Sequence, residues 1–245
     1  MRRRSLLIAI AGLVALAAAS DALAVTFTFW GPSSISSDAN DQVGNFAWVP
    51  YEITSIPASD TLIAVDGQSH SASTFSFSGA GLDLTFDHSR HSRGTLGLDA
   101  YGATFVRIRF SPSDDVAYAF DGAYSTAGET AGWTALDVAI SNTQTGPLYR
   151  SRQESFNTPA ETFILGGSGD DTNNILVGSP TGTLIAARKY DLDIGIFISA
   201  ERPAATTIAH GTGYVTMSLV PVPEPSTGLL RGAGIVALAA VPRRG

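Results

Sequence analysis

The chain has 245 residues, no cysteine and a formal net charge of −7 at pH 7. Without a thiol it has no disulfide, no cysteine-ligated zinc or iron–sulfur centre and no cysteine nucleophile. Residues 1–24 and residues 224–245 each carry a net charge of +2, so the part between them is near −11. A domain this acidic repels nucleic acid and anionic lipid surfaces, and we exclude both as binding partners.

The first 24 residues have the order of a secretory signal peptide. Arg2–Arg4 form a basic n-region, and Leu6–Ala19 form an apolar h-region. Ala22 and Ala24 supply the two small residues that signal peptidase needs before its cleavage site. The apolar run is too short for a transmembrane anchor, so we expect cleavage after Ala24 and export of the mature chain. A twin-arginine signal is the alternative route.

The first part of the mature chain alternates apolar and polar residues with period two, which predicts β-strands. Over residues 25–30 the alternation places Val25, Phe27 and Phe29 on one face, and Gly31-Pro32 ends the strand. Further short strands are predicted at residues 46–53, 61–65, 73–77 and 82–86, the last with Leu82, Leu84 and Phe86 facing the core.

The clearest strand of the sequence is residues 104–110. Its alternation sends Val106, Ile108 and Phe110 to the core and leaves Phe105, Arg107 and Arg109 on the outer face. A turn at residues 111–115 and an apolar return at residues 116–120 predict a hairpin.

The remaining strands are predicted at residues 135–140, 162–165, 174–177, 182–187, 190–198 and 213–220, with a turn at 141–146. No helical period occurs between the two ends of the chain. Strands at this spacing predict an all-β fold, in which residues 25–220 form one antiparallel β-sandwich or jelly-roll-like ectodomain.

Acidic loops are candidate calcium sites. Gly166-Gly167-Ser168-Gly169-Asp170-Asp171 matches the opening of a calcium-binding nonapeptide repeat, in which loop carbonyls and the carboxylate would hold the ion. Because only one copy is present, a glycine-rich hairpin loop is the alternative, and we expect no obligatory cofactor. Residues 38–41 and 114–115 are acidic loops of the same kind, read as solvated turns unless calcium binds.

Histidines and aromatic residues give weaker candidates. His88 and His91 have a spacing that zinc sites use, but two arginines share their segment, which favours an exposed polar loop. His70 and His210 are also expected in loops. Trp30, Trp48 and Trp133 would stack on sugar rings if exposed, with core packing as the alternative. No hydrolase or nucleotide-binding motif is present, and no catalytic residue is predicted.

The last segment of the chain, residues 221–245, joins a proline-rich spacer to an apolar run and a basic end. Pro221, Pro223 and Pro225 predict an extended segment outside the fold. Residues 228–241 would form a helix of about 21 Å, short of the roughly 30 Å of bilayer hydrocarbon. Its apolar residues include Gly228, Leu229, Leu230, Ile235, Val236 and Leu238, and Arg243 and Arg244 follow, as expected for a cytoplasmic end.

This order of parts resembles the PEP-CTERM sorting signal of Gram-negative bacteria. The motif residues are Val222, Pro223, Glu224, Pro225, Ser226 and Thr227. The resemblance implies that an exosortase, a membrane-bound cysteine-type transpeptidase or protease, recognises the Pro-Glu-Pro motif and processes an inner-membrane-anchored intermediate. It also implies an exopolysaccharide and biofilm setting. A tail without a sorting role is the alternative.

The sequence therefore predicts a non-enzymatic exported protein of the cell surface or extracellular matrix. Its expected partners are signal peptidase, an exosortase-type enzyme and exopolysaccharide, with transient membrane association. A carbohydrate- or calcium-binding sandwich module is the second hypothesis, and a secreted hydrolase is the third.

Overall fold

A computed structural model describes residues 25–40, 46–67, 69–92, 100–128, 133–156, 160–166, 174–200 and 207–222. All regular structure in these ranges is β-strand, in keeping with the alternation of polar and apolar residues along several of the segments. The strands are β1 Phe27–Phe29, β2 Ser34–Asn40, β3 Ala47–Glu52, β4 Ala58–Asp66, β5 Ser69–Ser78, β6 Gly81–Ser92, β7 Ala100–Pro112, β8 Val116–Gly128, β9 Trp133–Asn142, β10 Gly146–Phe156, β11 Glu161–Ile164, β12 Ile175–Gly178, β13 Thr181–Leu184, β14 Tyr190–Ala200 and β15 Thr207–Pro221.

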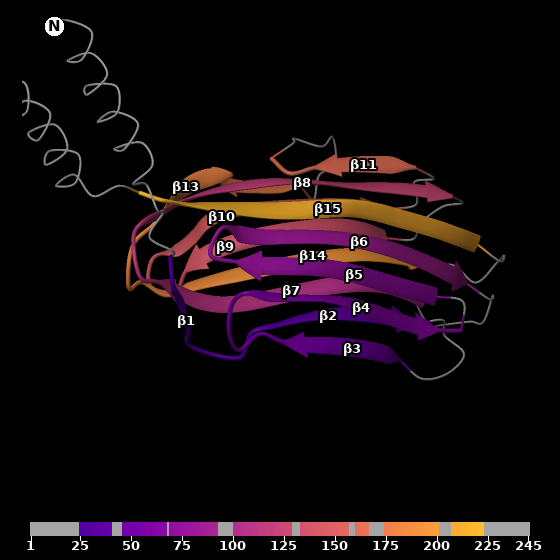
Figure 1. The fold of residues 1–245 in the computed structure, drawn as a ribbon. Coiled ribbons are helices and arrows are strands. Elements are labelled where there is room, and N and C mark those ends of the chain that lie inside the picture. The colour runs from indigo at the N-terminus through magenta and orange to yellow at the C-terminus, as the bar shows by residue number, and fades with distance from the viewer. Residues whose placement is uncertain are drawn as a thin grey trace, which may run out of the picture.

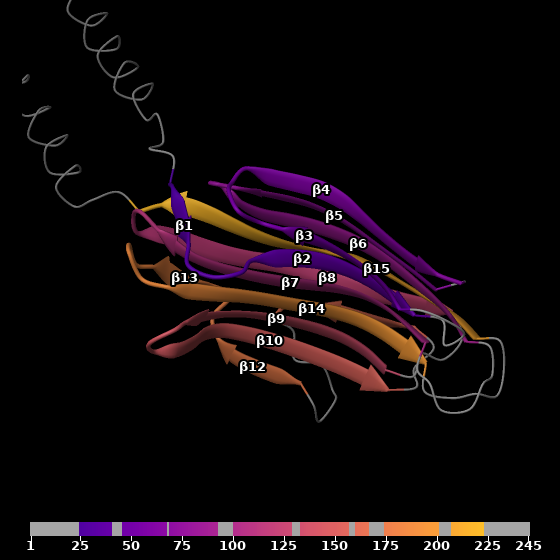
Figure 2. The same ribbon diagram turned by 90° about the horizontal axis from the view of Figure 1, so that it is seen from below.

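The strands form two antiparallel sheets that pack face to face, as Figures 1 and 2 show. Sheet A has the order β12-β10-β9-β14-β7-β2-β3, with β1 added beside β7. Sheet B has the order β11-β8-β15-β6-β5-β4, with β13 added beside β8. The all-β class and the two-layer β-sandwich are therefore confirmed. In the ranges above, no helix has the length and hydropathy needed to cross a membrane.

The core lies between the sheets and follows the predicted alternation. In β7, Val106, Ile108 and Phe110 are buried, whereas Phe105 is 44% exposed on the other face. Leu82, Leu84 and Phe86 of β6 are buried as expected, and they join one hydrophobic cluster with residues of both sheets. Burial of such side chains contributes about 1.5–3 kcal/mol each, which is how a chain without disulfides holds this sandwich together.

One region of the interior is polar and is bridged by hydroxyl groups. Ser37 of β2 lies 2.6 Å from Ser73 of β5, and Ser73 contacts Thr104 of β7 at 2.5 Å. Nε2 of His88, on β6, lies 2.7 Å from the Thr104 hydroxyl. These four side chains alternate between the two sheets, so hydrogen bonds as well as apolar contacts join the layers.

The predicted hairpin over residues 104–120 is wrong. β7 lies in sheet A and β8 lies in sheet B, so the turn at residues 113–115 carries the chain from one layer to the other. A short turn between two apolar strands fits either a hairpin or an arch. Here β7 pairs with β14 and β2, while β8 pairs with β15, and these distant partners decide the outcome.

Strands β2 and β10 were not predicted. Their sequences, SISSDAN and GPLYRSRQESF, are rich in serine, arginine and other polar residues. Each nevertheless buries several side chains: β2 buries every residue from Ile35 to Ala39, and β10 buries Tyr149, Ser151 and the run from Gln153 to Ser155. The alternation of apolar and polar residues is weak in these two sequences, because serines occupy inward positions where apolar residues were expected.

The described chain begins and ends at the same end of the sandwich, near β1 (Figure 1). Pro221 was expected in a spacer outside the fold. It is instead the last residue of β15. Pairing of β15 with β6 stops at Ser218, while pairing with β8 continues to Pro221. A proline is tolerated there because its missing N–H faces the open side of the strand. The N–H of Val222 then donates to the Asp115 carbonyl over 2.8 Å.

Candidate ligand-binding face of sheet A

The outer face of sheet A gathers side chains that alternate with the core residues of its strands. The cross-strand register aligns Ser34 of β2, Arg107 of β7, Asp193 of β14, Ala139 of β9 and Arg150 of β10 in one row. The next row runs through Ser36, Phe105, Gly195, Asp137 and Arg152 of the same strands. Because their sequence neighbours point inward, both rows lie on the outer face of the sheet, although Ser36 is largely covered there.

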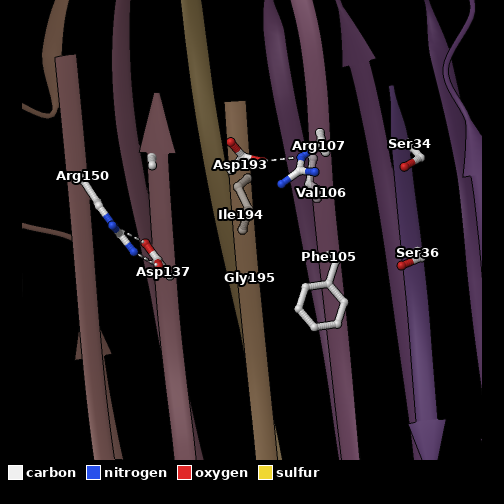
Figure 3. A pocket seen from close by; sticks show the side chains of 11 residues that line it. Ser34, Ser36, Phe105, Val106, Arg107, Asp137, Arg150, Asp193, Ile194 and Gly195 are labelled. Atoms are coloured by element: carbon white, nitrogen blue, oxygen red, sulfur yellow. Dashed lines mark hydrogen bonds and ion pairs between the residues drawn. The ribbon is translucent and has the colours of Figure 1, made fainter. Parts of the chain in front are cut away.

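A trough of about 620 Å³ lies over these two rows. Its low centre is made by Gly195 and Ala139, which have little or no side chain. Phe105 stands beside Gly195, and the Arg107–Asp193 and Arg150–Asp137 pairs lie on either side of the centre, as Figure 3 shows. A Cβ added at Gly195 would meet only the Phe105 ring, at 3.9 Å, so the space above this residue is open.

Ion pairs between neighbouring strands fix the orientation of the trough's charged groups. Arg150 donates to Asp137 through two nitrogens, at 3.1 Å from Nε and 2.6 Å from Nη2. Arg107 Nε donates to Asp193 Oδ1 over 2.8 Å. The carboxylate partner raises the pKa of each guanidinium, so both arginines stay charged. Exposed pairs of this kind contribute little to stability, so the fold itself does not explain them.

Two more arginines extend the charged array along the same face. Arg152 pairs with Glu154 on β10, and its Nη1 lies 4.0 Å from Asp137 Oδ2. At the other end, Arg109 Nε lies 3.7 Å from Asp191 Oδ1. Burial raises the pKa of Asp191, and the neighbouring Arg109 opposes that shift.

Aromatic rings form a strip beside the trough, defined here as Phe156, Trp133, Phe197, Tyr101 and Phe46. Consecutive ring centroids lie 6.4, 4.6, 5.4 and 6.2 Å apart, so the strip crosses four strands and ends just before β3. A smaller cavity of about 220 Å³ joins strip and trough, because Trp133 and Phe197 line it together with Phe105 and Gly195.

All three tryptophans lie on this outer face, so core packing was the wrong alternative for them. Trp48 of β3 is 58% exposed, and Trp133 belongs to the aromatic strip. Two cations lie near the Trp30 ring, the Arg109 guanidinium at 5.2 Å and the Lys189 ammonium at 5.3 Å from its centroid. The residue types mark these three tryptophans as candidates, but the local sequence does not determine that distant strands place them on one face.

The acidic segments predicted as candidate calcium sites lie only partly within the described residues. Asp38 and Asn40 lie in β2 rather than in a loop, and burial raises the pKa of Asp38. Asp114 accepts the Ser113 hydroxyl, and Asp115 accepts the N–H of Ala186. Asp170 and Asp171 lie outside the described residues. In the described ranges, no three histidine or carboxylate side chains gather as metal ligands would.

The histidines lie in strands, so the predicted loops are wrong. His88 is fully buried in β6, where it stacks on Phe86 with ring centroids 5.4 Å apart. Burial lowers its pKa to about 3, and the nearby His70 adds to that shift. His70 is part of β5 and His210 is part of β15. His91 is part of β6, with its side chain outside the description.

Sequence comparisons identify no relative: no family model matches the chain, and no curated protein does. Among solved structures, a family 11 carbohydrate-binding module from Clostridium thermocellum aligns with 74% of this chain and 95% of its own, at 9% identity and a TM-score of 0.22. The structure of infectious bursal disease virus, Gt strain, aligns with 82% of this chain and 65% of its own, at 11% identity and a TM-score of 0.19. Likenesses this distant carry no argument about the ligand.

Proposed function

We propose that this is an exported protein of the cell surface or matrix whose β-sandwich binds polysaccharide on the outer face of sheet A. The observation that carries the proposal is the trough between Arg–carboxylate pairs, with the aromatic strip beside it. Sugar rings have apolar C–H faces that pack on aromatic side chains, and hydroxyl groups that pair with charged donors and acceptors.

Binding explains this face better than hydrolysis does. A glycoside hydrolase needs one carboxyl group that donates a proton and a second that acts as base or nucleophile. The two carboxylates of the trough, Asp137 and Asp193, both accept hydrogen bonds from arginine. Neither is arranged as a proton donor, so the pairs serve to hold hydroxyl groups in place.

Delivery to the surface is part of the same proposal. A signal peptide over residues 1–24 would export the chain, and a sorting segment over residues 221–245 would be processed by an exosortase-type enzyme. Leu219 is the last buried residue of β15, so cleavage near Glu224 would leave the sandwich intact. Intact mass of the protein from cell envelope and medium tests this part. A species running from Val25 to near Glu224 is expected, and one that retains Arg243 and Arg244 would contradict sorting.

Binding is tested by calorimetric titration of the purified full-length protein with a panel of soluble polysaccharides. Trp133→Ala should weaken binding about tenfold, because it removes the largest ring of the strip, which packs between Phe156 and Phe197. Tyr214→Ala is the matched control, since Tyr214 is an exposed ring on the outer face of sheet B. Equal losses in both variants, or none in either, would rule out the aromatic strip as the binding site.

A further inference from the structure

The trough runs across the strands and not along them. Its lining comes from five adjacent strands, in the order β2, β7, β14, β9 and β10. Four strand spacings of about 4.8 Å give a length of roughly 19 Å. A site of this length accepts several consecutive sugar residues of one chain, lying at right angles to the strands.

Charges along the trough are balanced. The register that places each arginine beside a carboxylate gives the pairs Arg107–Asp193 and Arg150–Asp137, and Arg152 has Glu154. The outer side of β2 and β3 adds two more acids, Asp38 and Glu52. The face therefore has no excess of positive charge, even though four of the arginines with described side chains lie on it.

An acidic polysaccharide fits this balance poorly. Its carboxylate or sulfate groups would approach an arginine only by displacing Asp137 or Asp193, and they would then lie next to that displaced carboxylate. The two-nitrogen hydrogen bond from Arg150 to Asp137 makes such an exchange especially unfavourable.

An uncharged sugar needs no exchange. A pair of adjacent hydroxyl groups accepts from a guanidinium and donates to the neighbouring carboxylate while the ion pair stays intact. Ser34 adds an exposed hydroxyl group that both donates and accepts, and Phe105, which is 44% exposed, offers ring surface beside Gly195.

Resting on the proposed function, we infer that the ligand is an uncharged, linear polysaccharide that lies across strands β2 to β10. Acidic polysaccharides are the competing class, and the experiment below separates them.

The experiment titrates the full-length protein with uncharged polymers (hydroxyethylcellulose, galactomannan) and acidic ones (alginate, polygalacturonate) at about 20 mM and about 500 mM salt. We expect binding of an uncharged polymer, with an affinity that changes less than about twofold with salt. Six-residue fragments should bind at least about tenfold tighter than disaccharides, because the trough is roughly 19 Å long.

Each result has a distinct meaning. Binding of acidic polymers alone, or of both classes equally, overturns the inference but leaves polysaccharide binding in place. No heat with any glycan overturns the inference and the proposed function together. Equal affinity for disaccharides and six-residue fragments overturns the placement across the strands.

A variant with two neutralised carboxylates gives a sharper test. Asp137→Asn together with Asp193→Asn leaves Arg150 and Arg107 without carboxylate partners. This variant should gain alginate binding by at least about tenfold at low salt and lose affinity for the uncharged polymer. If it does not melt cooperatively, Asp193→Asn alone replaces it, because the Arg107–Asp193 pair is largely exposed. Failure of the folded variant to gain alginate binding would contradict the charge argument.

Discussion

The two outer faces of this sandwich have the same architecture and opposite chemistry. The outer face of sheet A carries three tryptophans, the aromatic strip and four arginines in ion pairs. The outer face of sheet B carries small polar residues and alanine, the exposed aliphatic side chains of Ile63, Val65, Ile164 and Val220, and the carboxylates of Asp83, Asp87 and Asp121. Its described aromatic ring is Tyr214, which donates to Asp121 over 3.0 Å.

Folding alone requires only that both outer faces be polar enough to meet water, and sheet B satisfies that requirement with small polar residues, scattered aliphatic side chains and a few carboxylates. Exposed rings and ordered ion pairs on sheet A add little to stability. The exposed rings and ion pairs of sheet A are therefore best explained by a ligand. Matched substitutions on the two faces test this proposal most directly.

The largest effect is expected from filling the trough with Gly195→Leu. The side chain points outward and meets only the Phe105 ring, so the fold should be kept or slightly stabilised, since glycine weakens a strand. Polysaccharide affinity should fall about 100-fold, which is about 2.7 kcal/mol. Titration and thermal melting measure the two quantities.

The matched control on sheet B is Ala123→Leu, at an outward position of β8. It adds a similar side chain to the face that we expect to be inert, so affinity should change less than about twofold. If Ala123→Leu lost binding, or if Gly195→Leu kept it, the outer face of sheet A would not be the binding site.

The next prediction concerns the pH dependence of stability. It depends on the buried interior between the two sheets, so it should affect both outer faces equally. His88 contacts Thr104 of sheet A, and the ring of Tyr124 and the charge of His70 lie near it. Its pKa is about 3 in the fold, compared with 6.5 for an ordinary histidine. Between these pH values the unfolded chain binds a proton that the folded chain does not, so stability falls as pH drops.

From pH 7 to pH 5 this loss should be about 2 kcal/mol, measured by urea unfolding at each pH. His88→Gln, which has no titratable ring and can still donate to Thr104, should remove that part of the pH dependence. The other titrating groups are common to both proteins, so the difference between the two slopes isolates His88. The same slope in the variant and the original protein would show that His88 is not the group responsible.

The smallest effect is expected from truncation after Val222. The cut keeps the Val222 N–H bond to Asp115 and every buried residue of β15, so both faces should keep their binding properties. Melting temperature should change by no more than about 2 °C, while the location of the protein in the cell changes. Loss of cooperative unfolding on truncation would show that the tail belongs to the fold.

Half of the candidate site could be predicted from the sequence. The alternation in β7 placed Phe105, Arg107 and Arg109 on an outer face, and the three tryptophans were named as sugar-stacking candidates. The other half came from β2 and β10, which supply Ser34, Ser36, Arg150 and Arg152 and were not recognised as strands. Their inward positions hold serine, so the hydrophobic period that reveals a strand is weak there.

By itself, the sequence determined the all-β class and the inward set of its clearest strands, because strand periodicity is a local property of consecutive residues. Only the tertiary structure decided which strands are neighbours. Arg107 meets Asp193 across 86 positions of the chain, and β7 and β8, adjacent in sequence, belong to different sheets. Pairing between distant strands depends on how the whole core packs, and the trough exists only because that packing brings five strands side by side.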